Sequence, residues 1–393
     1  MAWVVLLAPV AIGQTIDWSA REIALIDSLR LANLPQLPPS GSNRFANSVS
    51  AARLGEQLFQ DARFSLNGQI SCSTCHRADY DFTDSLSTAR GLGEVHRRSM
   101  PLSGLAYQRW FFWDGRADSL WAQALEPLEN PLEHGIDRAR VAQLIVKHYS
   151  QQYESALAPL PFVSPALLQD PRPSYGGAAA AQFWAELTPA EKSAMTEIFV
   201  NSGKAIAAFV RSLVPGQSRF DEFADALMSR TGPSQPLLNP AEVAGLKVFI
   251  GKGRCINCHN GPLFSNGEFH HAAVVDNGEQ DLGRAGVSNG LAEREFSCVS
   301  RWSDAPAENC KHLRFVKLNP LESYRAFKTP TLRNVAMRPP YMHAGQFSTL
   351  EQVLANYQMF SGQGSADEIF HGELTAQNQR DLIAFLATLT ATK

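Results

Sequence analysis

The sequence predicts a mainly α-helical protein built from two copies of one module. Alternating β-branched patterns are scarce along its 393 residues, whereas runs with helical spacing recur after residues typical of helix starts. The segment 53–59 (RLGEQLF), which precedes Cys72, is similar to 244–249 (AGLKVF), which precedes Cys255. Because internal similarity of this kind indicates repeated units, we expect two modules that meet near residue 235.

Five helix starts carry recognisable caps. In each of them a Ser, Thr or Asn side chain can accept a hydrogen bond from a backbone N–H of the first turn. In chain order these are Ser19 with Glu22, Thr188 with Pro189 and Glu191, Asn239 with Pro240, Ser348 with Glu351, and Thr375. Loops rich in Pro and Gly are expected at 35–45, 159–178 and 230–240, and a long loop at about 265–325.

The chain should therefore divide into an export signal at 1–13 and two modules at 14–235 and 236–393. Residues 1–13 are apolar and end in Ala-Ile-Gly, the small-x-small form of a signal cleavage site. A buried N-terminal segment is the alternative, because the usual basic start is missing. No other apolar run approaches the roughly 20 residues of a spanning helix, so we expect no stable membrane insertion.

Composition excludes two classes of protein. With 45% hydrophobic residues the chain is not disordered, and 35 Lys and Arg against 38 Asp and Glu give no basic surface for nucleic acid. Six cysteines are too few to staple a chain of this length. Cys298 and Cys310 lie in the long loop, where a disulfide is favoured over free thiols in an exported protein.

The other four cysteines form two copies of C-x-x-C-H, at 72–76 (CSTCH) and 255–259 (CINCH). Two thiols at this spacing can form thioethers to one porphyrin, and the adjacent His can reach its iron. A zinc site made of two CxxC pairs would not need a His after each pair. We therefore expect two covalently bound c-type haems and, because such attachment occurs outside the cytoplasm, a periplasmic protein. The expected attachment residues are Cys72, Cys75, Cys255 and Cys258, and the iron ligands are His76 and His259.

Together with these motifs, the segments 112–117 (FWDGRA) and 327–335 (FKTPTLRNV) resemble the bacterial di-haem cytochrome c peroxidases, including their MauG branch. The resemblance implies two cytochrome c-like haem domains. The N-terminal domain would react with hydrogen peroxide, and the C-terminal domain would transfer electrons.

The resemblance also implies roles for Trp113, Gln123 and Glu133, which keep the intervals of that family. Trp113 would lie between the haems, and Gln123 and Glu133 would lie over the open face of the first. A carboxylate there can act as general base and then general acid during O–O cleavage. Taken alone, Glu133 would be interpreted as a loop acid and Trp113 as a core aromatic residue.

Two positions distinguish the branches of the family. Leu92 stands where many of the peroxidases carry a His that closes the first haem, so this haem should be five-coordinate, although His96 lies close by. Tyr357 stands at the end of 349–357, where the peroxidases have a Met that ligates the second haem and MauG-type proteins have a Tyr. Met359 is the alternative ligand, and a core role is the alternative for Tyr357.

The family binds calcium between its haems through an Asn side chain and two backbone carbonyls. The matching positions here are Ser99, which replaces the Asn, and the carbonyls of Arg338 and Pro340. His343 falls near a haem edge, with its role open. The surface Trp that relays electrons in MauG is absent, since 253–254 is Gly-Arg. The sequence does not choose among other aromatic relays, such as Trp110, Trp121 and Trp302.

The resemblance thus implies an oxidoreductase that uses hydrogen peroxide to form a high-valent di-haem state, which oxidises an aromatic residue of a partner protein. One alternative is a cytochrome c peroxidase that takes electrons from a small cytochrome or cupredoxin. The other is an electron carrier without catalysis. Because the net charge is only −3, any partner should be recognised by a local patch.

Overall fold

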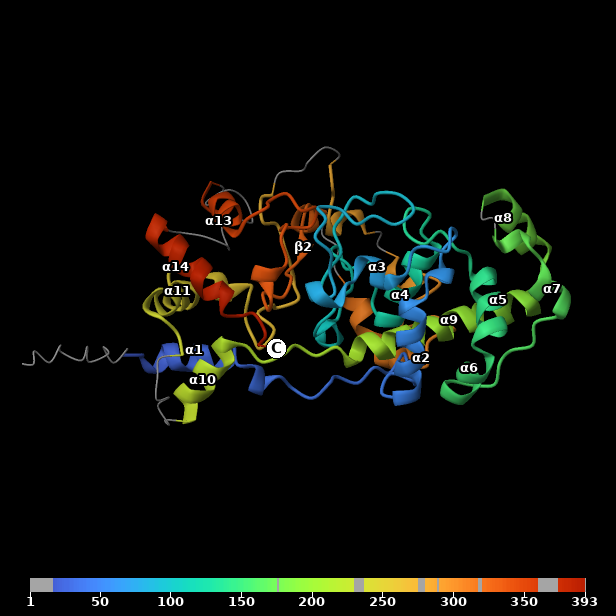
Figure 1. Ribbon diagram of the computed structural model, residues 1–393, viewed down its shortest axis with the longest axis horizontal. Coiled ribbons are helices and arrows are strands. Elements are labelled where there is room, and N and C mark those ends of the chain that lie inside the picture. Colours follow the sequence, from blue (N-terminus) through green and yellow to red (C-terminus); the bar gives the residue numbers. More distant parts are fainter. Residues whose placement is uncertain are drawn as a thin grey trace, which may run out of the picture.

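The computed structural model describes residues 17–174, 177–229, 237–274, 280–287, 290–316, 320–359 and 374–392. The expected signal at 1–13 and the predicted boundary near 235 lie outside these ranges. The described chain is mainly helical, which confirms the predicted fold class (Figure 1). Its two strands pair antiparallel: β1 (Phe269–His270) lies in the expected long loop, and β2 (Phe327–Lys328) begins the motif 327–335 that follows it.

The helices alternate with long connections and short 3₁₀ turns. They are α1 (Ala20–Ser28), α2 (Val49–Gln60), α3 (Cys72–Cys75), α4 (Leu120–Glu129), α5 (Arg138–His148), α6 (Ser150–Ala156), α7 (Pro165–Gln169), α8 (Gly177–Glu186), α9 (Pro189–Ser212), α10 (Arg219–Ser229), α11 (Pro240–Ile250), α12 (Pro320–Ser323), α13 (Leu350–Met359) and α14 (Ala376–Ala387). The caps at Ser19, Thr188, Asn239 and Thr375 are confirmed, each as a reciprocal capping box. In none of the described ranges is a helix long and apolar enough to cross a membrane.

Two local predictions are wrong. The cap of α13 lies one residue later than predicted, because Thr349 Oγ1 accepts from the N–H of Gln352 at 3.3 Å. The Gln352 side chain reaches back to the N–H of Ser348 at 2.8 Å, a role that the sequence pattern had assigned to Glu351. The expected loop at 159–178 contains the five-residue helix α7, which is too short to show helical periodicity.

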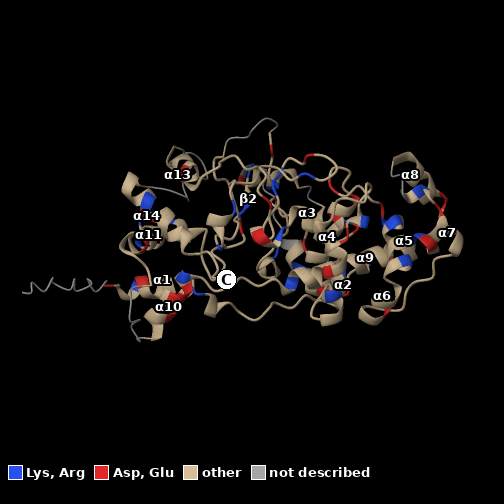
Figure 2. Cartoon of the chain, viewed as in Figure 1, with Lys and Arg blue, Asp and Glu red and all other residues tan. Residues whose placement is uncertain are grey.

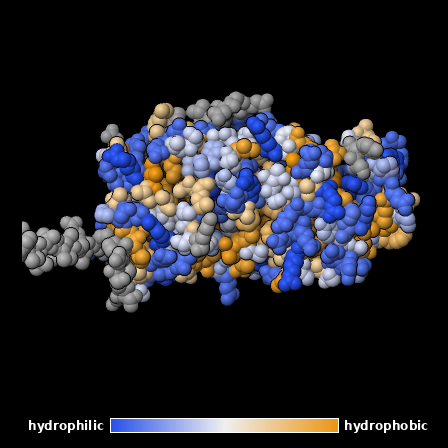
Figure 3. All heavy atoms as spheres, viewed as in Figure 1, coloured by the Kyte–Doolittle hydropathy of each residue, from blue (hydrophilic) through white to orange (hydrophobic). Residues whose placement is uncertain are grey.

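The helices form two groups, each around its own hydrophobic core (Figure 1). The first core contains α2, α4, α5 and α9. The second contains α11, α13 and α14, with the rings of Phe249, Phe264 and Phe385 packed together. Charged residues of both signs are interspersed over both groups (Figure 2), and the face seen in Figure 3 mixes hydrophilic and hydrophobic residues.

Two earlier segments also pack into the second core. Ile26 and Leu29 come from α1 and the turn after it, and Phe220 and Ala224 come from α10. The cores therefore place both segments with the C-terminal helices. The predicted division into 14–235 and 236–393 stays a prediction.

The repeated Gly of the two modules lies where two helices cross. Gly55 on α2 faces α9, and a Cβ there would collide with the carbonyl oxygen of Ala205. Gly245 on α11 faces α14, and a Cβ there would collide with the carbonyl oxygen of Asp381. The internal repeat thus reflects a shared packing requirement, close contact between the helix before each CxxCH motif and a later helix of the same core, α9 in the first core and α14 in the second.

Substitution of Gly245 by alanine should lower the free energy of unfolding by about 1–3 kcal/mol, because the added methyl must force two helix backbones apart. The measurement is denaturant unfolding of the holoprotein. Gly41 is the matched control, since its Cβ would meet only Ala305 Cβ at 3.8 Å. Equal stability of the two variants would contradict this account of the crossing.

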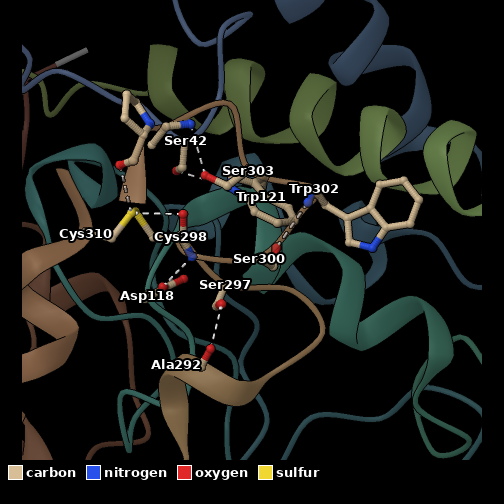
Figure 4. Close-up of a disulfide and its surroundings, with 12 residues drawn as sticks. Ser42, Asp118, Trp121, Ala292, Ser297, Cys298, Ser300, Trp302, Ser303 and Cys310 are labelled. Carbon is tan, nitrogen blue, oxygen red and sulfur yellow. Dashed lines mark hydrogen bonds between the residues drawn. A yellow bond between two sulfur atoms is a disulfide. The ribbon is translucent and has the colours of Figure 1, made fainter. Parts of the chain in front are cut away.

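The predicted disulfide between Cys298 and Cys310 is confirmed, with the two Cα atoms 5.7 Å apart (Figure 4). It lies in a small apolar cluster that Trp110 also contacts. The N–H of Cys298 donates to Asp118 Oδ2 at 2.7 Å. This bond attaches the loop of the second module to the segment just before α4, so the two modules share an interface on this side.

Candidate functional site

Two cavities lie on either side of Trp113. The first cavity is lined by Cys75, His76, Gln123 and Glu133, and the second by Cys255, Cys258, His259 and Tyr357. Trp113, Arg98, Ser99 and His343 line both. The structure therefore places each CxxCH motif at its own cavity and brings the candidate residues of 112–117 between them.

Both motif histidines are held in the same way. His76 Nδ1 lies 2.8 Å from the carbonyl oxygen of Phe82, and His259 Nδ1 lies 3.0 Å from that of Phe264. A carbonyl only accepts, so Nδ1 carries the proton and Nε2 keeps its lone pair. Burial lowers the pKa of both rings, that of His259 to about 4, which keeps them neutral.

This arrangement fits a haem at each motif. The four motif thiols are not joined in disulfides, and each pair lies beside a cavity that also holds a neutral histidine. The second cavity has mainly apolar walls, which include Phe249, Leu354 and Leu386, and such walls suit a porphyrin face.

In the first cavity, α4 supplies Gln123 and the turn after it supplies Glu133. Asn130 holds this turn, since its Nδ2 donates to Glu133 Oε1 at 2.8 Å. Burial raises the pKa of the Glu133 carboxyl group, against the lowering effects of Arg116 and the Asn130 hydrogen bond. The cavity thus holds a half-buried carboxylate that can exchange a proton at a pH above its ordinary range.

Leu92 belongs to the strip that pairs with this turn, as its N–H donates to the carbonyl of Glu133 at 3.0 Å. Its side chain packs toward Gly135, where an added Cβ would meet Leu92 Cδ1 at 2.5 Å. His96 is exposed and lies on the lining of the first cavity.

Trp113 is held from both modules. Its Nε1 donates to the carbonyl of Arg98 at 3.0 Å, and its own carbonyl accepts from the N–H of Lys328 at 2.8 Å. Asp114 beside it accepts from Arg97 Nη1 at 2.6 Å. The two sequence motifs 112–117 and 327–335 thus lie against each other and fix the indole between the cavities.

Comparison with known proteins agrees with this geometry. The family model for di-haem cytochrome c peroxidase matches residues 49–227. The methylamine utilization protein MauG of Methylorubrum extorquens is 31% identical over 383 residues, which cover 96% of this chain and 88% of that protein. The chain belongs to the di-haem cytochrome c peroxidase family.

Other relatives agree with the assignment. Cytochrome-c peroxidase IdrP1 of Pseudomonas sp. (strain SCT) is 27% identical over 92% of this chain and 85% of that protein. The diheme peroxidase BthA of Burkholderia thailandensis shares the fold, with a TM-score of 0.60 at 21% identity over 87% of this chain and 86% of that one. A MauG-like protein associated with microbial copper homeostasis also shares the fold, with a TM-score of 0.58 at 24% identity. The match covers 91% of this chain and 95% of that one. The chain is a peroxide-dependent oxidoreductase with two haem cofactors.

Helix α13 of this di-haem peroxidase carries two candidate ligands, Tyr357 and Met359, and they differ in burial. Tyr357 lies on the lining of the second cavity, as His259 does. Met359 is 71% exposed. Met342, which the sequence analysis did not consider, also lies on that lining.

Lys328 is a second residue whose importance the sequence did not predict, although it lies inside the motif 327–335. It is buried on the lining of the second cavity, and its Nζ donates to the carbonyl of Trp110 at 2.8 Å. Burial lowers the pKa of Lys328 to about 7. The sequence signal for its burial was a lysine placed directly after the apolar pair Ala326-Phe327 and two residues before Pro330.

The aromatic residues that were left open occupy different depths. Trp121 is buried in the first core, where its Nε1 donates to Ser42 Oγ at 3.1 Å (Figure 4). Trp110 and Trp302 are partly exposed. Trp110 packs edge-on against His312, with ring centroids 5.8 Å apart.

The residues matched to calcium also lie between the modules. Ser99 Oγ donates to Asp84 Oδ2 at 2.7 Å, and the carbonyl of Arg338 accepts from Arg98 Nη1 at 3.1 Å. Pro340 follows a cis peptide bond. His343 nearby stacks on Phe327, with ring centroids 3.7 Å apart.

Proposed function

We propose that this di-haem peroxidase is a MauG-like enzyme, which uses hydrogen peroxide to oxidise an aromatic side chain of a partner protein in the periplasm. The observation that carries the proposal is Tyr357 on the lining of the second cavity, with Met359 turned to solvent. The apolar segment 1–13 and the two CxxCH motifs support the periplasmic location.

Bound covalently through the four CxxCH cysteines, the haems supply the site of peroxide reduction and the store of oxidising equivalents. His76 and His259 would hold the two irons from Nε2, since the carbonyls of Phe82 and Phe264 already accept from Nδ1. These two carbonyl contacts set the orientation of each ring before any substrate arrives.

Proton handling falls to Glu133. The carboxylate accepts a proton from peroxide and delivers it to the oxygen that leaves, while Gln123 orients the molecule by its amide. Asn130 keeps the carboxylate in position. Leu92 offers no ligand, and His96 on the lining of the first cavity is exposed to solvent, so the proposal leaves this cavity open to peroxide.

Trp113 couples the two cavities. Its indole lies on the lining of both, and its hydrogen bond to Arg98 fixes the ring. Tyr357 would provide an oxygen ligand to a haem in the second cavity, and an anionic oxygen suits highly oxidised iron better than a thioether does. A haem held in this way would supply a store of oxidising equivalents for a partner.

The rate constant for reaction with peroxide should fall as the pH falls. Glu133 must be ionised to accept a proton, and burial raises its pKa above the ordinary value of 4.5, so the base is lost at a higher pH than for an exposed carboxyl group. Stopped-flow measurements across the pH range test this. A profile that is the same for the wild type and Glu133→Gln would contradict it.

The function itself is tested by comparing two electron sources. We expect slow steady-state turnover with a reduced small c-type cytochrome. We also expect a peroxide-dependent mass change, seen by mass spectrometry, in a protein encoded beside this one. Tyr357→Met is the matched variant, and it should shift activity toward the cytochrome. Rapid turnover of the wild type with cytochrome, without a protein mass change, would instead establish a cytochrome c peroxidase.

A further inference from the structure

We propose that the guanidinium group of Arg98 takes the place of the calcium ion between the two modules, so that this chain needs no metal there. Of the three residues matched to calcium, Ser99 and Arg338 are already hydrogen-bonded to other protein groups. The proposal concerns this interface alone and does not depend on which substrate the enzyme oxidises.

Two of the three matched ligands have other partners. The carbonyl oxygen of Arg338 accepts from Arg98 Nη1 at 3.1 Å. Ser99, where the resemblance expects an amide oxygen, turns its hydroxyl to Asp84 Oδ2 at 2.7 Å. The other oxygen of Asp84 accepts from the N–H of Leu86 at 3.0 Å. Calcium requires six to eight oxygen ligands, and here the oxygens of Ser99, Asp84 and Arg338 already take part in hydrogen bonds within the protein. Asp81 Oδ2 has no hydrogen-bond partner in the described part of the chain, but it lies 3.5 Å from Arg338 Nε, which occupies its open side with a cation.

The charges of the buried side chains around Arg98 also disfavour a calcium ion. Arg98 is 7% exposed and Arg338 is 5% exposed, so two cations are buried side by side. Asp84 and Asp81 balance them, and Asp81 Oδ2 lies 3.5 Å from Arg338 Nε. The four side chains are neutral as a group, and a divalent cation would add two charges next to two guanidinium groups.

Arg98 also makes the links that a bridging ion would make. Its guanidinium reaches the Arg338 carbonyl in the second module, its N–H donates to the carbonyl of His343 at 2.9 Å, and its carbonyl holds Trp113 Nε1 at 3.0 Å. One residue therefore connects Trp113 to the C-terminal module, which makes Arg98 a positioning residue for the indole.

One donor of this group is unused in the described part of the chain. Arg98 Nε is buried without a hydrogen-bond partner, and Arg98 lies on the lining of both cavities. A buried guanidinium N–H calls for an acceptor, and the propionate carboxylates of a bound haem supply that chemistry. A guanidinium group thus suits this place for a second reason: its N–H groups donate to a carboxylate in fixed directions, which a calcium ion does not do.

The first test uses the wild-type holoenzyme. After equilibration with calcium and removal of free ions, elemental analysis should find well under one calcium per chain. A chelator should leave the ferric spectrum unchanged, and calcium titration by calorimetry should give no binding heat. A stoichiometric calcium ion, or a spectrum that changes with chelator, would overturn the proposal.

The second test asks whether Arg98 itself excludes the ion. Ser99→Asn supplies the amide oxygen and keeps Arg98, so it should still not bind calcium. Arg98→Ala combined with Ser99→Asn should bind one calcium with a Kd below about 1 mM, the range of extracellular calcium modules. Calcium should then restore the wild-type ferric spectrum of this double variant.

The outcomes of the second test are decisive in both directions. Calcium binding by Ser99→Asn alone, or a folded double variant that binds none, would overturn the proposal. If the double variant does not fold, the wild type and Ser99→Asn still decide, because stoichiometric calcium in either would contradict it.

Discussion

Replacement of Glu133 by glutamine should slow the reaction of the ferric holoenzyme with hydrogen peroxide by about 10²–10⁴-fold. Glutamine keeps the size of the side chain and can still accept the Asn130 hydrogen bond, which is 2.8 Å long at Glu133 Oε1. It cannot accept the peroxide proton. The loss therefore reports proton transfer and not a change in the shape of the first cavity.

Glu129→Gln is the matched control for this experiment. Glu129 ends α4 four residues earlier and pairs with Arg138 at 2.8 Å, away from the first cavity. Its variant should react with peroxide at the wild-type rate. Stopped-flow absorbance at the haem bands gives both rate constants, and a Glu133→Gln variant within a few-fold of the control would exclude Glu133 as the base.

Replacement of Arg333 by methionine should lower the free energy of unfolding by about 3–5 kcal/mol. Arg333 forms a two-pronged ion pair with Asp221 at 2.8 and 3.0 Å, and the side chains are 2% and 1% exposed. Its loss would leave Asp221 charged and buried. Because Asp221 lies on α10 and Arg333 in the motif 327–335, the pair also joins two parts of the second core.

The pH dependence of this pair has a definite sign. Burial acts to raise the pKa of Asp221, but the hydrogen bonds and charge of Arg333, with Ser218, outweigh burial and leave the pKa lowered. The contribution to stability is thus present above the unfolded pKa, and it is lost as the pH falls through the folded value. Wild type and Arg333→Met should converge in stability in acid.

Denaturant unfolding of the holoprotein measures this effect. Arg333→Met combined with Asp221→Asn should recover part of the loss, since no unpaired charge remains. Arg172→Met is the control, because Arg172 pairs with Asp170 at the surface and should change little. A cost below about 1 kcal/mol for Arg333→Met would contradict the assignment of this pair as a buried anchor.

Sequence patterns predicted what depends on short-range spacing. The cap at Ser19, the disulfide between Cys298 and Cys310 and the two CxxCH motifs each follow from residues close together in the chain. The cap of α13 was misplaced by one residue, because Ser348 and Thr349 are adjacent and equally able to cap.

What the sequence could not show depends on contacts between distant segments. The packing of α1 against α11 in the second core joins residues roughly two hundred positions apart. Arg98 looked like one of two adjacent basic residues, and only the fold places it against Arg338 and Trp113. Lys328 similarly becomes notable only through its burial against Trp110.

The ferric spectrum of the holoenzyme tests the central claim most directly. The proposed function assigns Leu92 and Tyr357 to the two distal positions, and on that proposal we expect one high-spin five-coordinate haem and one haem with an oxygen ligand. It predicts no near-infrared band of a methionine ligand. Tyr357→Met should introduce that band. Two low-spin haems, or a methionine band in the wild type, would contradict the account.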